Sequence, residues 1–315
     1  MSATMAAVTV SPHRISSSWL AWYFVVVWGS GFLATKVGLQ YAPPFTFLTL
    51  RFAFGMLLVV PIALAVRPRW PDSFEQWLHV AIAGLLMHAV NLGGSHYAQY
   101  LGMSAGIAAL VLALQPLVTA VVAGPFIGER LNRLQWTGVL LGFAGVALVV
   151  WHKVDLDAMS TASLAAVLIA LVAITAGTLY QRRFCPAVDL RAASVVQFAA
   201  TLLFIAPLAL AFEDFRFQVS WQLLVSIGFL VIFASTLAVN ALHTLMRRGE
   251  APRVTSLLYL TPIIAVALEW LMFGIYPTWL TALGVVITCA GVALVAVKLR
   301  DKSKLQEAEV PRSTT

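Results

Sequence analysis

The chain has 315 residues, of which 61% are apolar and only 10% are charged, and its formal net charge is +7. Soluble domains contain about 25% charged residues, so this composition excludes a soluble globular protein. The apolar residues occur in blocks of roughly 20, the length that crosses a bilayer as one helix. The two cysteines, Cys185 and Cys289, form neither a disulfide framework nor a metal-ligand cluster, and we expect no metal or cofactor.

In chain order, the apolar blocks predict an all-α integral membrane protein with ten transmembrane helices. They cover residues 19–38, 44–66, 77–98, 103–123, 134–151, 162–181, 192–212, 220–243, 252–272 and 279–298. The short connections leave no room for a soluble domain. The polar residues before the first block lack the layout of a signal peptide, so we expect no cleaved targeting sequence.

The basic residues predict the orientation of these helices. If the amino terminus is cytoplasmic, the inner segments hold sixteen lysines and arginines, and the outer segments hold only Lys153 and Arg216. The positive-inside rule therefore predicts that both termini are cytoplasmic. Because topology accounts for the basic surplus, we expect membrane lipids as neighbours and no nucleic-acid partner.

The chain repeats itself at a constant shift of 146 residues. "RFAFGMLLVVPIALA" at 51–65 aligns with "QFAATLLFIAPLALA" at 197–211, and Lys36 aligns with Arg182. Each copy contains five segments, and an odd number makes the second copy enter the membrane from the opposite side. Two inverted halves around a central site are typical of secondary transporters that work by alternating access.

Several stretches resemble the EamA family of the drug/metabolite transporter superfamily. They are "WGSGFLATKVGL", the "RF" that begins at residue 51, "LQPLVTAVVAGPFIGERLNRLQWTGVLLGFAGVALV" and its second copy, "YLTPIIAVALEWLMFGIYPTWLTALGVVITCAGVALV". The resemblance implies two EamA-type repeats at 18–151 and 162–298, between tails at 1–17 and 299–315. It also implies a multi-pass exporter or permease of the bacterial inner membrane for small metabolites, often amino acids or their derivatives. The family's Gly-Glu pair is present at Gly128 and Glu129, but the second copy has Ile275 after Gly274.

Two aligned prolines, Pro116 and Pro262, lie near the middle of the fourth and ninth segments. A proline inside a helix removes a hydrogen bond and kinks the helix. Gln115 and Thr261 directly precede these prolines. Because irregular backbone at this depth is tolerated where it lines a cavity, we predict Gln115 and Thr261 as substrate-binding residues; a simple packing kink is the alternative.

Polar side chains in the third and eighth segments are further candidates for a central cavity. His88 and Asn91 share one helical face in the third segment, and Asn240 lies in the eighth. A polar face within the membrane should point to the protein interior, although hydrogen bonding between helices would explain it equally. Tyr259 is an aromatic candidate for binding substrate. His88 is also a candidate proton carrier.

Three charged residues, Lys36, Arg51 and Glu269, lie inside predicted helices at a similar depth in the outer part of the membrane. Lys36 near a helix end is expected to extend to the interface, and Arg51 to pair with Glu269 or with backbone carbonyls. Alternatively, these residues form an anion-binding vestibule, because an arginine fork suits a carboxylate or a phosphate. Glu269 and Lys36 are therefore predicted for coupling or charge pairing.

Glycines in the fifth and tenth segments form faces of small residues for close helix packing. They are Gly138, Gly142, Gly145, Gly284 and Gly291. This packing would lie within the fold or would join two subunits into a homodimer.

The sequence thus predicts a secondary active transporter that exports small polar metabolites. Uptake of an anionic or vitamin-like compound is the alternative. A membrane-embedded enzyme would need paired carboxylates, HExxH or a Ser/His constellation, and the sequence presents none of these.

Overall fold

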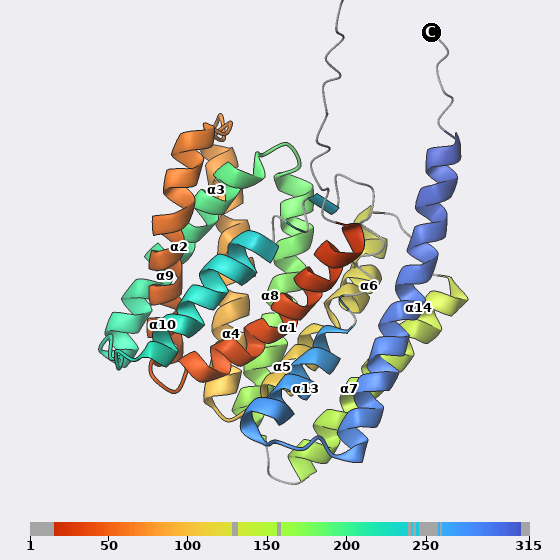
Figure 1. The fold of residues 1–315 in the computed structure, drawn as a ribbon. Coiled ribbons are helices and arrows are strands. Elements are labelled where there is room, and N and C mark those ends of the chain that lie inside the picture. Colours follow the sequence, from red (N-terminus) through yellow and green to blue (C-terminus); the bar gives the residue numbers. More distant parts are fainter. Residues whose placement is uncertain are drawn as a thin grey trace, which may run out of the picture.

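The structure is a computed structural model that describes residues 16–127, 132–155, 159–238, 241, 244–245, 258 and 260–309. The described chain is helical throughout its membrane segments (Figure 1). The elements are α1 (Ser17–Gly38), α2 (Pro44–Val66), α3 (Phe74–Gly84), η1 (Leu85–Val90), α4 (Asn91–Tyr100), α5 (Ala105–Leu112), α6 (Gln115–Ile127), α7 (Arg133–Asp155), α8 (Thr161–Phe184), α9 (Leu190–Glu213), α10 (Trp221–Gly228), η2 (Phe229–Ala238), α13 (Thr261–Phe273) and α14 (Trp279–Glu309).

These elements form ten membrane segments, which confirms the predicted fold class. Over the described ranges, eight segments are long and apolar enough to cross a bilayer, and two shorter apolar helices span Thr261–Phe273 and Trp279–Val295. α14 continues as a helix to Glu309, well beyond the predicted end of the last membrane segment.

Serine side chains fix the beginnings of five helices. In α1, α3, α5, α8 and α10 the hydroxyl of the preceding serine accepts a hydrogen bond from the backbone N–H three residues later. The first N–H groups of a helix have no partner within the helix, and hydrocarbon offers none. A serine at these positions therefore defines where each helix begins.

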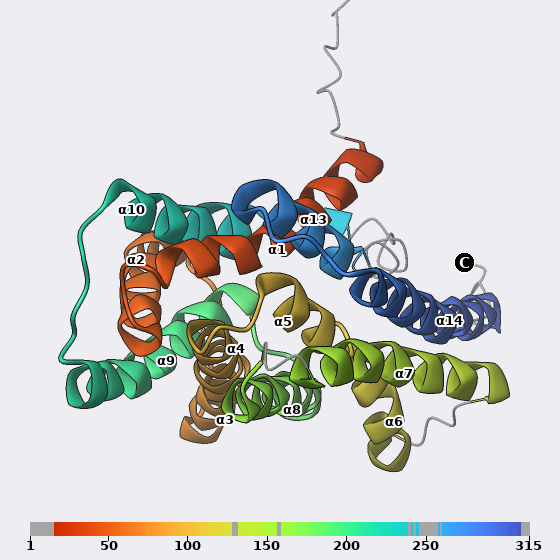
Figure 2. The same ribbon diagram turned by 90° about the horizontal axis from the view of Figure 1, so that it is seen from below.

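The two repeats exchange their first helices. α1 packs against α10, η2 and α13 of the second repeat, whereas α8 packs against α3, η1 and α4 of the first. Figure 2 shows the resulting two rows, with α10, α1 and α13 on one side and α9, α4 and α8 on the other. Each row therefore contains helices from both repeats.

Antiparallel packing of α7 and α14 shows that the repeats are inverted. A side chain at Gly138 would meet the backbone of Gly291, and one at Gly145 would meet the backbone of Gly284. Residue numbers thus rise along α7 while they fall along α14, and these two helices are copies of each other. The glycine faces contact each other inside one chain (Figure 1), so the alternative that these faces join two subunits is not supported.

Both repeats contain a π-helix at the same position, which the sequence analysis did not predict. η1 covers 85–90, and the shift of 146 residues places its counterpart at 231–236, inside η2. π-helical turns are rare and occur mostly at functional sites. Their presence in both copies makes the third and eighth membrane segments candidates for the functional site.

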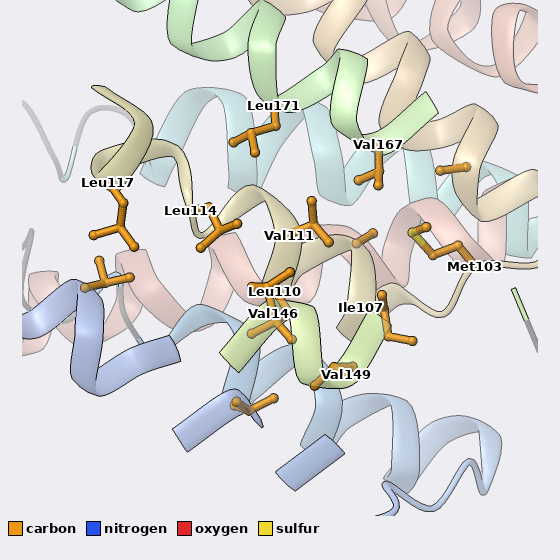
Figure 3. Close-up of a cluster of buried hydrophobic side chains, with 14 of the residues drawn as sticks. Met103, Ile107, Leu110, Val111, Leu114, Leu117, Val146, Val149, Val167 and Leu171 are labelled. Atoms are coloured by element: carbon orange, nitrogen blue, oxygen red, sulfur yellow. The ribbon is translucent and has the colours of Figure 1, made fainter. Parts of the chain in front are cut away.

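The largest apolar core of the described residues lies where α5 and α6 meet α7, α8 and α14. Figure 3 shows Leu110 and Leu114 with Val146 of α7 and Leu171 of α8. The helix stops after Leu112 and restarts at Gln115. The core therefore holds two short helices, α5 and α6, and the break between them lies where the kink was predicted.

We expect Gly145→Val to lower the free energy of unfolding by about 1–3 kcal/mol, because the added atoms overlap the backbone of α14. Denaturant unfolding in detergent, followed by tryptophan fluorescence, measures this loss. Gly228→Ala is the control: no atom lies within 4 Å of a side chain added there, so that variant should be at least as stable as the parent. Equal stability of Gly145→Val and the parent would contradict the close packing of α7 and α14.

Candidate functional site

Phe52 of α2 and Phe198 of α9 meet where the two repeats contact each other at one side of the bundle (Figure 2). Their ring centroids lie 5.0 Å apart in an edge-to-face arrangement, and the two residues occupy equivalent positions in the repeats. Equivalent residues of inverted copies meet at the pseudo-two-fold axis. The preceding residues, Arg51 and Gln197, are therefore also placed beside this axis.

Arg51 is a partly buried cation without an acidic partner. Its Nη2 lies 3.4 Å from Ser235 Oγ of η2, and its guanidinium carbon lies 6.0 Å from the centre of the Phe52 ring. Across the described ranges, no carboxylate forms an ion pair with it. The predicted pairing with Glu269 is wrong, because Glu269 binds another residue, as described below.

His88, in the π-helix η1, contacts both of these phenylalanines. Its ring lies 5.7 Å from that of Phe52 and 5.5 Å from that of Phe198. Its Nε2 lies 3.3 Å from Gln197 Oε1, and Gln197 Nε2 donates to Gln181 Oε1 at 3.3 Å. Because an amide oxygen can only accept a hydrogen bond, the contact with Gln197 Oε1 places the proton of the neutral His88 imidazole on Nε2.

α4 contributes buried polar atoms that have no hydrogen-bond partner among the described residues. They are Asn91 Oδ1, His96 Nδ1 and both amide atoms of Gln99. Asn91 Nδ2 donates to the Met87 carbonyl at 3.0 Å, and His96 Nε2 lies 3.4 Å from Thr35 Oγ1. Buried polar groups usually have partners, so these atoms are available to a solute or to solvent.

The fourth segment is interrupted between α5 and α6, just before Pro116, whereas most residues before Pro262 lie outside the described residues, so the kink at Pro262 stays a prediction. Pro116 is the second residue of α6, and Pro262 lies in the first turn of α13. In the first turn a missing N–H costs no helical hydrogen bond. Gln115 Nε2 donates to Thr178 Oγ1 of α8 at 3.0 Å, which joins two helices. Thr261 is buried, and its hydroxyl has no partner in the described part of the chain.

Lys36 of α1 forms an ion pair with Glu269 of α13. Lys36 Nζ and Glu269 Oε1 are 2.5 Å apart, and the side chains are 21% and 4% exposed. The Glu269 carboxylate also accepts hydrogen bonds from the N–H groups of Ala105 and Gly106, both at 3.0 Å. From the sequence, we expected Lys36 to extend to the membrane interface. In the structure, Glu269 binds its ammonium group instead. Its ammonium group also lies 4.8 Å from the centre of the Phe273 ring.

A second glutamate binds a helix start at the same end of the molecule. Glu213, at the end of α9, accepts from the N–H groups of Phe45 and Thr46 and from the Thr46 hydroxyl, at 3.0, 2.7 and 2.8 Å. Both glutamates belong to the second repeat, and both helix starts belong to the first. This end of the bundle is thus closed by carboxylates that join the repeats.

Some predicted site residues cannot be placed, and some central residues were missed. Asn240 and Tyr259 lie outside the described residues. Gln197 and Phe198 were not predicted as site residues from the sequence, although their alignment with the "RF" of the second segment was a usable signal. Gln99 was not predicted either, although it lies two turns after Asn91 on the same helical face.

The model of the EamA-like transporter family matches residues 16–151 and 161–297, which is one match for each repeat. The chain belongs to this family. As an EamA-like transporter it is a multi-pass membrane protein that moves a small molecule and is not an enzyme. The resemblance noted in the sequence is thereby confirmed.

Three similar proteins illustrate the relationship of this EamA-like transporter to others. The uncharacterized inner membrane transporter YedA of Escherichia coli is 28% identical over 79% of this chain and 84% of its own. A probable amino-acid metabolite efflux pump of Escherichia coli is 28% identical over 89% of this chain and 95% of its own. The uncharacterized transporter YvbV of Bacillus subtilis is 26% identical over 91% and 92%.

One solved crystal structure has the same fold as this EamA-like transporter. It aligns with a TM-score of 0.65 over 92% of this chain and 99% of its own, with 21% sequence identity. At this identity the match extends to the fold alone.

Replacing Gln197 by leucine should lower the free energy of unfolding by about 1–3 kcal/mol, because His88 Nε2 and Gln181 Oε1 both lose a partner. Thermal unfolding in detergent measures the change. Ser194→Ala is a matched control one turn away on α9: this hydroxyl is exposed and bonds only to its own helix, so the expected change is within about 0.5 kcal/mol. A stability loss confined to Ser194→Ala would contradict the central hydrogen-bond chain.

Proposed function

We propose that this EamA-like transporter is a secondary active exporter of small polar metabolites, such as amino acids or their derivatives. It would work by alternating access between its inverted repeats. The observation that carries this proposal is Arg51, a cation beside the pseudo-two-fold axis that contacts, among the described residues, a hydroxyl at 3.4 Å and an aromatic ring. Such a residue is a binding site for an anionic group, because an unpaired charge within a membrane is costly.

The surroundings of Arg51 suit a carboxylate attached to a polar body. A guanidinium group binds a carboxylate through two parallel hydrogen bonds. Buried acceptors and donors without protein partners, on Asn91, Gln99 and Thr261, would bind the remaining polar groups. We propose His88, Asn91, Gln115 and Thr261 as the lining of this site, and Asn240 and Tyr259 as candidates on sequence grounds alone.

Relatives support the substrate class and the membrane. One relative is named a probable amino-acid metabolite efflux pump, and another an inner membrane transporter. We infer from the positive-inside pattern that both termini face the cytoplasm. The end of the bundle that contains Lys36, Glu269 and Glu213 is then the outer end.

Purified protein in proteoliposomes tests the proposal, with counterflow of a labelled amino-acid panel as the readout. We expect Arg51→Gln, which copies the residue of the other repeat, to lower the initial rate at low substrate by about 10- to 100-fold. This range corresponds to the roughly 1.5–3 kcal/mol of a hydrogen bond to a charged group. Arg51→Lys should keep part of the rate, because it keeps the charge but not the fork.

Arg69→Gln is the control, since Arg69 is an exposed cation in the connection between α2 and α3. It should transport at the parental rate. No movement of any amino acid or related anion by the parent protein would refute the proposed function. Accumulation against a gradient in the inward direction only would favour uptake of an anionic compound over export.

A further inference from the structure

Four buried polar residues of α4 form a set that we call the α4 stripe. Asn91, Ser95 and Gln99 follow each other at intervals of four residues, which places them on one helical face, and His96 lies beside them. Their exposed fractions are 7%, 3%, 7% and 2% in this order. Within a membrane, polar groups on such a face must find partners in the protein or in a water-filled space.

Three residues of the α4 stripe have atoms that no protein group satisfies. Asn91 Oδ1, His96 Nδ1 and both amide atoms of Gln99 have no hydrogen-bond partner among the described residues. Gln99 is the extreme case, because its amide lacks both a donor and an acceptor. Buried groups without partners raise the free energy of the conformation that buries them. These atoms therefore favour a conformation in which water or a solute reaches the stripe.

The second repeat shows that the fold does not require polar residues at these positions. At the shift of 146 residues, each of the four positions is occupied by an apolar residue: Leu237, Ala241, Leu242 and Leu245. Leu245, the counterpart of Gln99, is fully buried. The same architecture thus packs well with apolar side chains, so packing does not explain the polar ones. Because the repeats are inverted, the polar version is present towards one side of the membrane only.

The α4 stripe begins at the level of Arg51. Phe47 and Phe52 of α2 lie against His96 and His88, with ring distances of 5.6 and 5.7 Å. The third membrane segment therefore runs antiparallel to α2. Arg51, between the two phenylalanines in sequence, is level with the residues between His88 and His96. The stripe thus starts at the depth of the proposed anion site and continues towards one end of the bundle.

That end of the bundle is closed in this structure. His96 Nε2 lies 3.4 Å from Thr35 Oγ1 of α1, and the next residue, Lys36, forms the ion pair with Glu269 of α13. Glu269 also accepts a hydrogen bond from the N–H of Ala105, at the start of α5. α1, α5 and α13 therefore meet at the end towards which the stripe runs. In the topology inferred from the positive-inside pattern, this is the outer end.

We propose that the α4 stripe lines the outward half of the translocation path. In the outward-open conformation, its free donors and acceptors bind water and the ammonium, amide or hydroxyl groups of the transported molecule, between Arg51 and the outer surface. In the conformation described here, the outer end is closed and the same atoms are buried without partners. This inference deepens the proposed function and rests on its topology, because it assigns the stripe to the side on which an exported molecule is released.

Gln99→Leu, which copies residue 245 of the second repeat, tests the stripe through two effects of opposite sign. We expect the midpoint of thermal unfolding in detergent to rise by a few degrees, because the closed conformation no longer buries an unsatisfied amide. The initial rate of amino-acid counterflow should fall about 10-fold, because the outward-open conformation and the solute both lose a hydrogen-bonding partner. A glutamine that only supported packing would lose stability when replaced.

Gln222→Leu is the matched control for this variant. It makes the same chemical change at a partly exposed position of α10, where the protein does not enclose the amide. Thermal stability and counterflow rate should both stay at the parental values.

Cysteine labelling tests the path without any transported molecule. Ser95→Cys exchanges a hydroxyl of the stripe for a thiol, in full-length protein that also carries Cys185→Ala and Cys289→Ala. Ala98→Cys is the matched control, because Ala98 is 0% exposed on the same helix but belongs to the apolar core. The probe is a membrane-impermeant maleimide added to one side of sealed vesicles of known orientation. Val219→Cys, at a position that is 78% exposed, gives the rate of a freely accessible thiol.

From the outer side, we expect Ser95→Cys to react about 10 times faster than Ala98→Cys, because the protein visits the outward-open conformation without substrate. From the inner side, Ser95→Cys should react more slowly than from the outer side.

Equal outer labelling of Ser95→Cys and Ala98→Cys would overturn the proposal, and so would faster labelling of Ser95→Cys from the inner side. A Gln99→Leu variant that unfolds at a lower temperature than the parent, or that transports at the parental rate, would also overturn it. If Gln99→Leu does not fold, the labelling result decides. Because labelling needs no transported molecule, its outcome is separate from the parental counterflow result that judges the proposed function.

Discussion

Every polar group inside a membrane must find its partner within the protein, and this constraint explains much of the structure. Serine hydroxyls satisfy the first N–H groups of five helices, and Glu213 and Glu269 satisfy the starts of α2 and α5. The same rule makes Arg51 conspicuous, since its hydroxyl neighbour is a weak partner for a full charge. Among the described residues, most of the buried polar atoms without a partner belong to α4.

The membrane segments and the duplication could be predicted from the sequence, because the apolar blocks and the constant shift of 146 residues can both be read from the order of the residues. The breaks in the fold could be predicted only in part: Pro116 indicated an irregularity, but whether the helix kinks or restarts depends on the packing of α6. Partners in the site could not be predicted. Lys36 and Glu269 are separated by 233 positions, and only the assembled helices decide whether Glu269 meets Lys36 or Arg51. The π-helices had no recognisable sequence signal.

The two halves share their architecture but differ in chemistry. Arg51 corresponds to Gln197, and Glu269 corresponds to Ala123. The backbone symmetry allows two related conformations, whereas these substitutions make the conformations unequal in energy. If the two halves were identical, the two conformations would have equal energy. The polar residues that differ between the halves are therefore where substrate binding and coupling can favour one conformation over the other.

The contact between α7 and α14 has a consequence for biogenesis. α7 is made well before α14, but the backbone surface that covers its glycines belongs to α14. Until α14 emerges from the ribosome, this face of α7 lies against lipid or insertion machinery. The nascent protein can therefore form this helix contact only after α14 has been made.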